Sequence, residues 1–212
     1  CIRDRLTSSR RVREYYEADQ GEGTVLDRMF DSLHANRFLE DKITTSILSE
    51  DEIADAASPE LADIRRHKRA ASAKGRQILQ KIISSPSYKS TLQEALITQR
   101  DGRFVVPVKA DHRGDLPGLV HDISASGATL FVEPMGVVQA NNELKELEAK
   151  EKKEIERILA ELSAEAGSFA SGIVSSYEAA VQLNLIFAKA NLGYKMKAAL
   201  PEVNDEGKID LK

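Results

Sequence analysis

Residues 95–110 read ALITQRDGRFVVPVKA, two runs of strand-like residues joined by Asp101-Gly102. Both positions of such a two-residue turn require positive φ, so this pair between two runs is a strong signal for a β-hairpin. Phe104, Val106 and Val108 fall on one face of the second run, because side chains alternate along a strand. The stretch therefore predicts an antiparallel hairpin with one apolar face.

Two further strands are predicted downstream of this hairpin. They are residues 118–123 and 128–133, joined by a short turn at 124–127 in which Gly127 supplies a left-handed position. The sequence thus predicts four antiparallel strands, in meander order, within residues 95–133. Four strands can be stable where a single hairpin is marginal.

Helical patterns flank the β region on both sides. Ser58-Pro59-Glu60 predicts a helix start, because Ser caps free amides, Pro suits the first turn and Glu complements the helix dipole. A heptad-like seam with alternating spacings of three and four residues follows, and a second such seam comes after the β region. The first seam is Leu61, Ile64, Lys68, Ala71, Gly75, Ile78 and Ile82, and the second is Val137, Asn141, Leu144, Glu148, Glu151, Ile155, Ile158 and Leu162.

The two heptad helices are predicted to pair antiparallel. Each seam has a weak, polar stretch at a similar distance from the β region, and one helix is rich in Lys and Arg where the other is rich in Glu. Pairing would place Lys68 against Glu148 or Glu151. Exposed ion pairs contribute only about 0–1 kcal/mol each, but they help to set register. The alternative is that each helix packs elsewhere with its charges in solvent.

The remaining segments are predicted to form a helical core. Residues 26–38 follow helical spacing, whereas the pattern breaks over 43–57, where an acidic turn suggests a short hairpin. Helical apolar spacing resumes over 169–187, after an interruption by Gly167 and Gly172. Residues 204–211 are predicted to form a turn and a strand.

Composition narrows the class of protein. Of the 212 residues, 42% are hydrophobic, 30% are charged and only 5% are aromatic, which favours long solvated helices over a large β-sandwich. The net charge of −4 does not require a polyanionic partner. The single Cys excludes an intrachain disulfide and favours a reducing, cytoplasmic location. No run of about 18 apolar residues occurs, so no membrane association is expected.

No catalytic or metal-binding pattern occurs in the sequence. There is no phosphate-binding loop, and the histidines lack metal-ligand spacing, so no catalytic residue, cofactor or metal is predicted for this chain. The basic run at 65–69 is a candidate nucleic-acid surface. A solvated helix face balanced by the partner helix's glutamates explains it as well.

Candidate nucleic-acid contacts lie in the β region. They are Arg103, Lys109, His112 and Arg113. Arg103 and Lys109 fall on the face opposite Phe104, so we expect both to point outward, toward the loop that carries His112 and Arg113. Such side chains could contact phosphates without reading bases. The alternative is that they are ordinary loop charges.

Four stretches of the chain resemble the MutS-II family, a second bacterial paralogue of the DNA mismatch repair protein MutS. They are SPELADIRR at 58–66, GRFVVPVKA at 102–110, GLVHDISASGATLFVEP at 118–134 and NNEL at 141–144. The resemblance covers nearly the whole chain and implies a mainly α-helical fold. It implies a helical core at 1–57 and 166–212, an antiparallel helix-pair lever at 58–85 and 136–165, and a small four-stranded antiparallel β clamp at 86–135.

The same resemblance implies a function for the full-length protein. It implies an ATPase domain that binds ATP and Mg²⁺ and an Smr endonuclease domain, both absent from this fragment, which is itself not expected to be an enzyme. It also implies a homodimer that clamps branched DNA in recombination suppression and DNA repair, or collided ribosomes and their RNA in ribosome quality control. The alternative is a structural coiled-coil dimerisation or scaffold arm without nucleic-acid contact.

Overall fold

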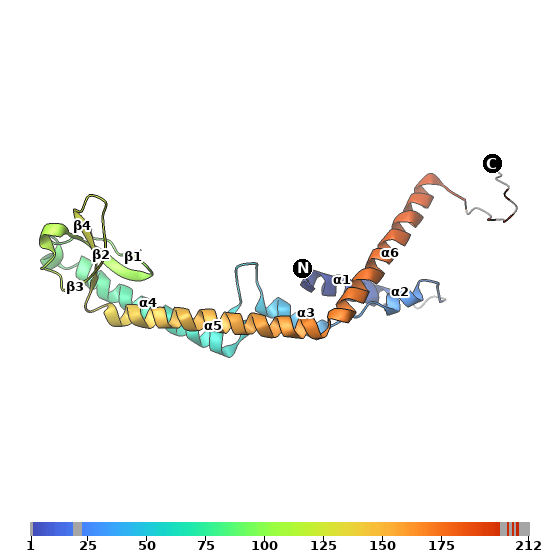
Figure 1. Cartoon of the computed structure of the whole chain (residues 1–212), viewed down its shortest axis with the longest axis horizontal. Coiled ribbons are helices and arrows are strands. Elements are labelled where there is room, and N and C mark those ends of the chain that lie inside the picture. The colour runs from blue at the N-terminus through green and yellow to red at the C-terminus, as the bar shows by residue number, and fades with distance from the viewer. Residues whose placement is uncertain (1, 19–22, 200–202, 204, 206, 208–212) are drawn as a thin grey trace. The chain divides into compact units, whose positions relative to one another are not determined.

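The computed structural model describes residues 2–18, 23–199, 203, 205 and 207 (Figure 1). The chain divides into two compact units. We call residues 1–44 and 163–212 the helical unit and residues 45–162 the sheet unit. Helices dominate, and one small antiparallel sheet of four strands is present, which confirms the predicted fold class.

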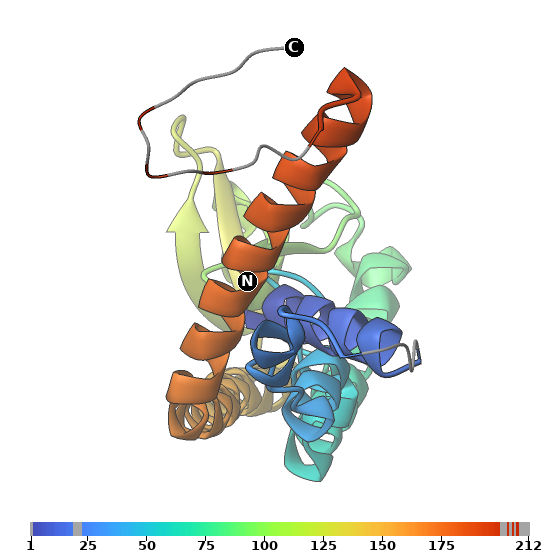
Figure 2. The same cartoon turned by 90° about the vertical axis from the view of Figure 1, so that its right-hand side faces the viewer.

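The helical unit is built from α1 (Ile2–Ala18), α2 (Asp27–Asp31), most of α3 (Arg37–Ser46), the end of α5 (Val138–Ser168) and α6 (Ala170–Met196). Helix α6 packs against α1 and α2 (Figures 1 and 2). Among the described residues, apolar side chains form a small buried cluster between α2 and α6 and another between α1, α3 and α5. The first contains Phe30, Leu33, Ala179 and Leu183, and the second contains Leu6, Leu39 and Ala166.

The single helix predicted over 26–38 was wrong, because residues 32–36 interrupt it. Asn36 explains the second start, since its side-chain oxygen accepts a hydrogen bond from the backbone N–H of Leu39 at 3.0 Å. Such a bond satisfies an amide that has no partner within the helix. Phe38, which the helical spacing counted as apolar, is 69% exposed.

The predicted short hairpin after α3 is confirmed, although it is minimal. Helix α3 continues to Ser46, beyond the predicted break at 43. Ile47 and Ile53 then form one antiparallel bridge, and the N–H of Leu48 donates to the C=O of Glu52 at 3.0 Å.

Helix α4 (Pro59–Ile83) begins where the sequence predicts. Ser58 Oγ accepts a hydrogen bond from the N–H of Leu61 at 2.9 Å, and Pro59 occupies the first turn. The predicted seam largely matches the buried face, which consists of Leu61, Ile64, Ala71, Gly75 and Leu79.

Helices α4 and α5 pair antiparallel, as predicted. Contacts between them run in opposite directions along the chain: Lys68 pairs with Glu151, and Gly75 lies beside Ala140. Ser58, just before α4, bonds Glu154, and Ile78 lies beside Gly136, just before α5. Lys68 Nζ is 2.8 Å from Glu151 and 4.0 Å from Glu148. The predicted charge pairing between the helices is therefore confirmed.

The sheet contains β1 (Thr98–Arg100), β2 (Arg103–Lys109), β3 (Gly118–Ile123) and β4 (Thr129–Pro134) in the order β1-β2-β4-β3. The predicted meander order was wrong. Val132 pairs with Val106, so β4 lies at the centre and β3 at the edge. Burial accounts for this choice, because Val132 is buried while Leu119 and Ile123 of β3 are exposed.

The β1–β2 turn has the predicted geometry. Asp101 and Gly102 have φ values of 50° and 73°, the left-handed values that this turn requires. The turn directs Phe104, which is 3% exposed, into the core between the sheet and α4.

Gly75 gives the apparently weak seam of α4 a structural role. A Cβ on Gly75 would lie 3.4 Å from the ring of Phe104 and 3.6 Å from the Cβ of Ala140. The small residue therefore makes room for a side chain of the sheet. Packing against Phe104, and not only pairing with the glutamates of α5, therefore explains why α4 has small residues in this part of its seam.

Glu154 should make the stability of the sheet unit sensitive to acid. Hydrogen bonds from Arg157 and Ser58 lower the pKa of Glu154 from 4.5 to about 2, although burial opposes the shift. Because the folded pKa lies below the unfolded one, this stabilisation is complete above about pH 4.5 and is lost as the pH falls toward 2. As the pH falls from about 4.5 to 2, the free energy of unfolding of wild type, measured with urea, should fall toward that of Glu154→Gln.

The control for this measurement is Glu156→Gln, which changes an exposed carboxylate on the same helix. Its difference from wild type should stay small, because exposed side chains away from special sites contribute little to stability. A difference for Glu154→Gln that remained constant between pH 4.5 and 2 would contradict the assignment.

The C-terminal part departs from the prediction in detail. The interruption expected at Gly167 and Gly172 is a break at Phe169, between α5 and α6. Apart from Asp205 and Gly207, the strand predicted over 204–211 lies outside the described residues. Within the described part of the chain, no helix has the length and apolarity needed to cross a bilayer.

Candidate nucleic-acid interface

A buried polar network joins the sheet to α5. Glu133 on β4 has no exposed surface, and it accepts hydrogen bonds at 2.8 Å from both Arg103 and Asn141. His121 on β3 donates to the other oxygen of the same carboxylate. The donors come from two strands and a helix, so Glu133 ties β2, β3 and β4 to α5.

Asn141 completes the hydrogen bonding of β2 where β4 cannot. The register of the two strands, continued by two residues, brings Phe104 opposite Pro134, which has no backbone N–H. The side-chain amide of Asn141 accepts from the N–H of Phe104 and donates to its C=O, each at 3.1 Å. It therefore takes the place of the next peptide group of the sheet.

The network keeps Glu133 ionised. Burial by itself would raise the pKa of Glu133, but hydrogen bonds from Asn141, His121 and Arg103 outweigh it and lower the pKa. The carboxylate is therefore an anion at neutral pH. Its charge balances the guanidinium of Arg103 inside the network.

Arg103 differs from the outward-facing contact expected from the strand pattern. Its side chain is only 19% exposed, and besides Glu133 it donates to the side-chain oxygen of Asn142 at 2.8 Å. Lys109 lies at the opposite end of β2, about 20 Å away at the rise of a strand. The four predicted contact residues therefore do not form one cluster.

The other three candidates lie at and just after the C-terminal end of β2. Lys109 Nζ donates to the backbone C=O of Ser90 at 2.9 Å, and the ring of His112 lies 2.7 Å from the carboxylate of Asp115. Arg113 is exposed and makes no ion pair or side-chain hydrogen bond with any residue that the structure describes. We call Lys109, His112 and Arg113 the sheet tip.

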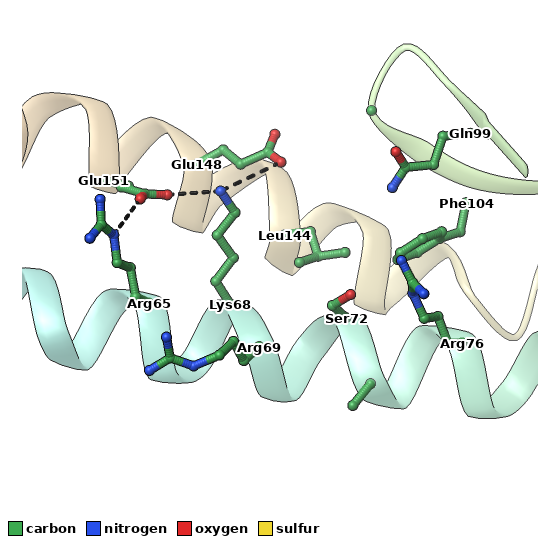
Figure 3. A pocket seen from close by; sticks show the side chains of 12 residues that line it. Arg65, Lys68, Arg69, Ser72, Arg76, Gln99, Phe104, Leu144, Glu148 and Glu151 are labelled. Carbon is green, nitrogen blue, oxygen red and sulfur yellow. Dashed lines mark hydrogen bonds and ion pairs between the residues drawn. The ribbon is translucent and has the colours of Figure 1, made fainter. Parts of the chain in front are cut away.

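A second cationic surface lies along α4. An open groove of about 520 Å³ runs between α4, α5 and the β1–β2 hairpin, and we call it the basic groove (Figure 3). Its α4 wall carries Arg65, Lys68, Arg69 and Arg76, whereas the α5 wall carries Glu148 and Glu151. The basic run noticed in the sequence therefore contributes to a hollow surface.

One end of the groove is already neutralised. Glu151 accepts hydrogen bonds from Arg65 at 2.7 Å and from Lys68 at 2.8 Å. Burial would raise the pKa of Glu151, but these two bonds outweigh it and lower the pKa. At this end, the charges are explained by helix pairing.

The other end of the groove holds an arginine without an anionic partner. The guanidinium of Arg76 lies 5.3 Å from the centre of the Phe104 ring, and Gln99 points toward both (Figure 3). Among the described residues, none forms an ion pair or a hydrogen bond with the Arg76 side chain. Arg69, nearby, is 68% exposed and lies 3.4 Å from Asp55.

Sequence reasoning missed the part of the groove that combines distant segments. Arg76, Gln99 and Phe104 come together only because the sheet packs on α4. Helical spacing alone could have placed Arg65, Arg69 and Arg76 on one face. No local signal points to Gln99.

The sequence predicts neither a catalytic residue nor a metal site in this chain. Within residues 2–18, 23–199 and the three described tail positions, no group of three or more His, Cys, Asp or Glu residues is placed to hold a metal ion.

The chain is similar to long bacterial proteins over its full length, although no protein-family model matches it. It is 47% identical over 212 residues to a protein named Endonuclease MutS2 from Pelotomaculum thermopropionicum, covering 100% of this chain and 27% of that protein. Proteins with the same name from Ruminiclostridium cellulolyticum and Acetivibrio thermocellus are 46% and 44% identical over 98% and 99% of the chain, which covers 26% and 27% of their lengths. The chain thus spans about a quarter of the length of these curated relatives. It belongs to the MutS-II family.

Proposed function

We propose that this region clamps nucleic-acid substrates within a full-length MutS-II protein. Residues 58–85 and 136–165, which include α4 and most of α5, serve as the lever. Residues 86–135 serve as the clamp, and residues 1–57 and 166–212 as parts of the helical core. The observation that carries the proposal is the network around Glu133, which fixes the sheet to α5. A sheet held in this way would move with the helix pair as one body.

Control of the clamp is proposed to come from elsewhere in the full-length protein. The lever would follow an ATPase domain that binds ATP and Mg²⁺, and a homodimer would bring two clamps around one substrate. Branched DNA in recombination suppression and collided ribosomes in translation quality control are both compatible with a clamp that contacts phosphates. The relatives' name adds an endonuclease activity to the proposal for the whole protein.

A scaffold arm without nucleic-acid contact is the second candidate function. The paired charges of α4 and α5 favour it, because ion pairs such as Arg65 with Glu151 serve helix pairing alone. The unpaired, exposed Arg113 favours the clamp, because helix pairing gives it no role.

Neutralising the sheet tip should weaken nucleic-acid binding by the full-length protein. We expect Lys109→Gln/Arg113→Gln to lower the slope of log affinity against log salt by about 1.4–1.8 units, because two phosphate contacts are lost. The loss should be similar for different sequences, since backbone contacts read no bases. A salt titration with labelled four-way-junction DNA and with ribosomal RNA measures it.

Lys74→Gln/Lys81→Gln is the matched control, because it removes two exposed charges from α4. It should leave the salt slope unchanged. An unchanged salt slope in the tip variant would show that Lys109 and Arg113 are ordinary solvated charges without a phosphate contact. Failure of the wild-type protein to bind any nucleic acid would favour the scaffold.

A further inference from the structure

A regular row of polar side chains follows the α4 wall of the basic groove. Arg65, Arg69, Ser72 and Arg76 are spaced by four, three and four residues. At 3.6 residues per turn, these positions fall within an arc of about 60° around the helix. Arg69 and Arg76 lie about 10.5 Å apart along its axis.

The charge along this row is not balanced. Arg65 is bound by Glu151 and Asp55, and the exposed Arg69 makes a 3.4 Å contact with Asp55. Arg76 has the Phe104 ring as its neighbour and makes no ion pair within the described chain. An Arg side chain carries five N–H donors and stays protonated. The groove therefore offers unused donors to an anion at the end where Gln99 lies.

We propose that this end of the basic groove binds the sugar–phosphate backbone of one nucleic-acid strand, through Arg69, Ser72, Arg76 and Gln99. The inference rests on the proposed function and adds a contact surface outside the sheet tip. Arg, Ser and Gln side chains are typical ligands of phosphate oxygens. The 10.5 Å between the arginines is close to the axial rise of three phosphate steps along one strand, about 10 Å.

The burial of Phe104 limits what the groove can recognise. The ring is 3% exposed and faces Arg76 and Gly75, so no surface remains on which a base could stack. The strand is therefore bound through its phosphates and independently of sequence. An acidic protein segment would meet the same arginines, but its carboxylates need not recur at the spacing of Arg69 and Arg76, whereas the phosphates of a strand recur regularly.

The test compares two double variants of the full-length protein. Arg69→Gln/Arg76→Gln removes the groove donors, whereas Lys74→Gln/Lys81→Gln removes two exposed charges about 120–160° away on the same helix. Fluorescence anisotropy with a labelled single strand and a four-way junction gives affinity at several salt concentrations. The groove variant should lower the salt slope by about 1.4–1.8 units, which corresponds to an affinity loss of roughly 25- to 60-fold at about 0.1 M salt.

A photo-crosslinking amino acid gives an independent readout. Placed at Gln99, it should capture the labelled strand, whereas at Lys74 it should not. Arg76→Lys should retain most of the salt slope, because the charge remains, and circular dichroism should confirm that each variant is folded.

Each remaining outcome separates this inference from the proposed function. If the wild-type protein binds and the groove and control variants lose equal affinity, or none, the groove assignment is overturned while the clamp stands. Capture of an acidic peptide but not of nucleic acid at Gln99 also overturns it. Absence of nucleic-acid binding by the wild-type protein overturns both.

Discussion

Replacing Asn141 with Leu should destabilise the sheet unit by about 3–5 kcal/mol. The substitution keeps the volume but leaves the N–H and C=O of Phe104 without their partner. It also removes one of the two hydrogen bonds to Oε1 of Glu133, to which Arg103 still donates. Each buried polar group that loses its only hydrogen bond costs about 1–3 kcal/mol. Urea unfolding of the chain, followed by circular dichroism, measures the loss.

Asn142→Leu is the control, because it makes the same change at the next position of α5. Asn142 is exposed and accepts one hydrogen bond from Arg103, which keeps its two bonds to Glu133. We expect a cost below about 1 kcal/mol. Equal losses in the two variants would show that Asn141 does not complete the sheet.

The local signals in the sequence predicted their elements well. Ser58 predicted the start of α4, and Asp101-Gly102 predicted the β1–β2 turn, because each signal depends only on neighbouring backbone groups. Neither signal depends on what packs against it. Such features can be recognised before any tertiary contact is known.

The errors arose where distant residues decide the local structure. The order of β3 and β4 in the sheet depends on which of them has a neighbouring strand on each side. Apolar and polar residues alternate in a similar way in both segments, so the sequence does not distinguish them. The break after α2 is held by the N–H of His34, which donates to Ser176 Oγ at 2.8 Å across the helical unit. No pattern within residues 26–38 contains that partner.

The candidate site shows the same limit. Charge and spacing singled out Arg103, but its buried anion, Glu133, lies on another strand and was not predicted as its partner. The sequence suggested the basic run on α4, yet the neutralised and unpaired ends of the groove differ only through contacts with α5 and the sheet. A charge can therefore be found in a sequence, while its partner must come from the fold.

Replacing Gly118 with Ala should destabilise the sheet by about 3 kcal/mol. A Cβ at this position would lie 2.3 Å from the backbone oxygen of Glu133 and 2.7 Å from a methyl group of Val132. The backbone oxygen cannot rotate away as a flexible side chain can, so β3 must separate from β4. Overpacking of this kind typically costs about 1–3 kcal/mol, and here it also pulls on the strand that holds the Glu133 carboxylate.

Gly114→Ala is the matched control, because a Cβ there meets no atom within 4 Å. We expect that substitution to change the free energy of unfolding by less than about 0.5 kcal/mol. Thermal and urea unfolding of both variants compare the same chemical change in the loop and at the edge of the sheet. If Gly118→Ala proved as stable as Gly114→Ala, β3 could not approach β4 as closely as the register of Gly118 with Pro134 requires. The Glu133 network would then need a looser edge strand, and His121 could not be held against the carboxylate.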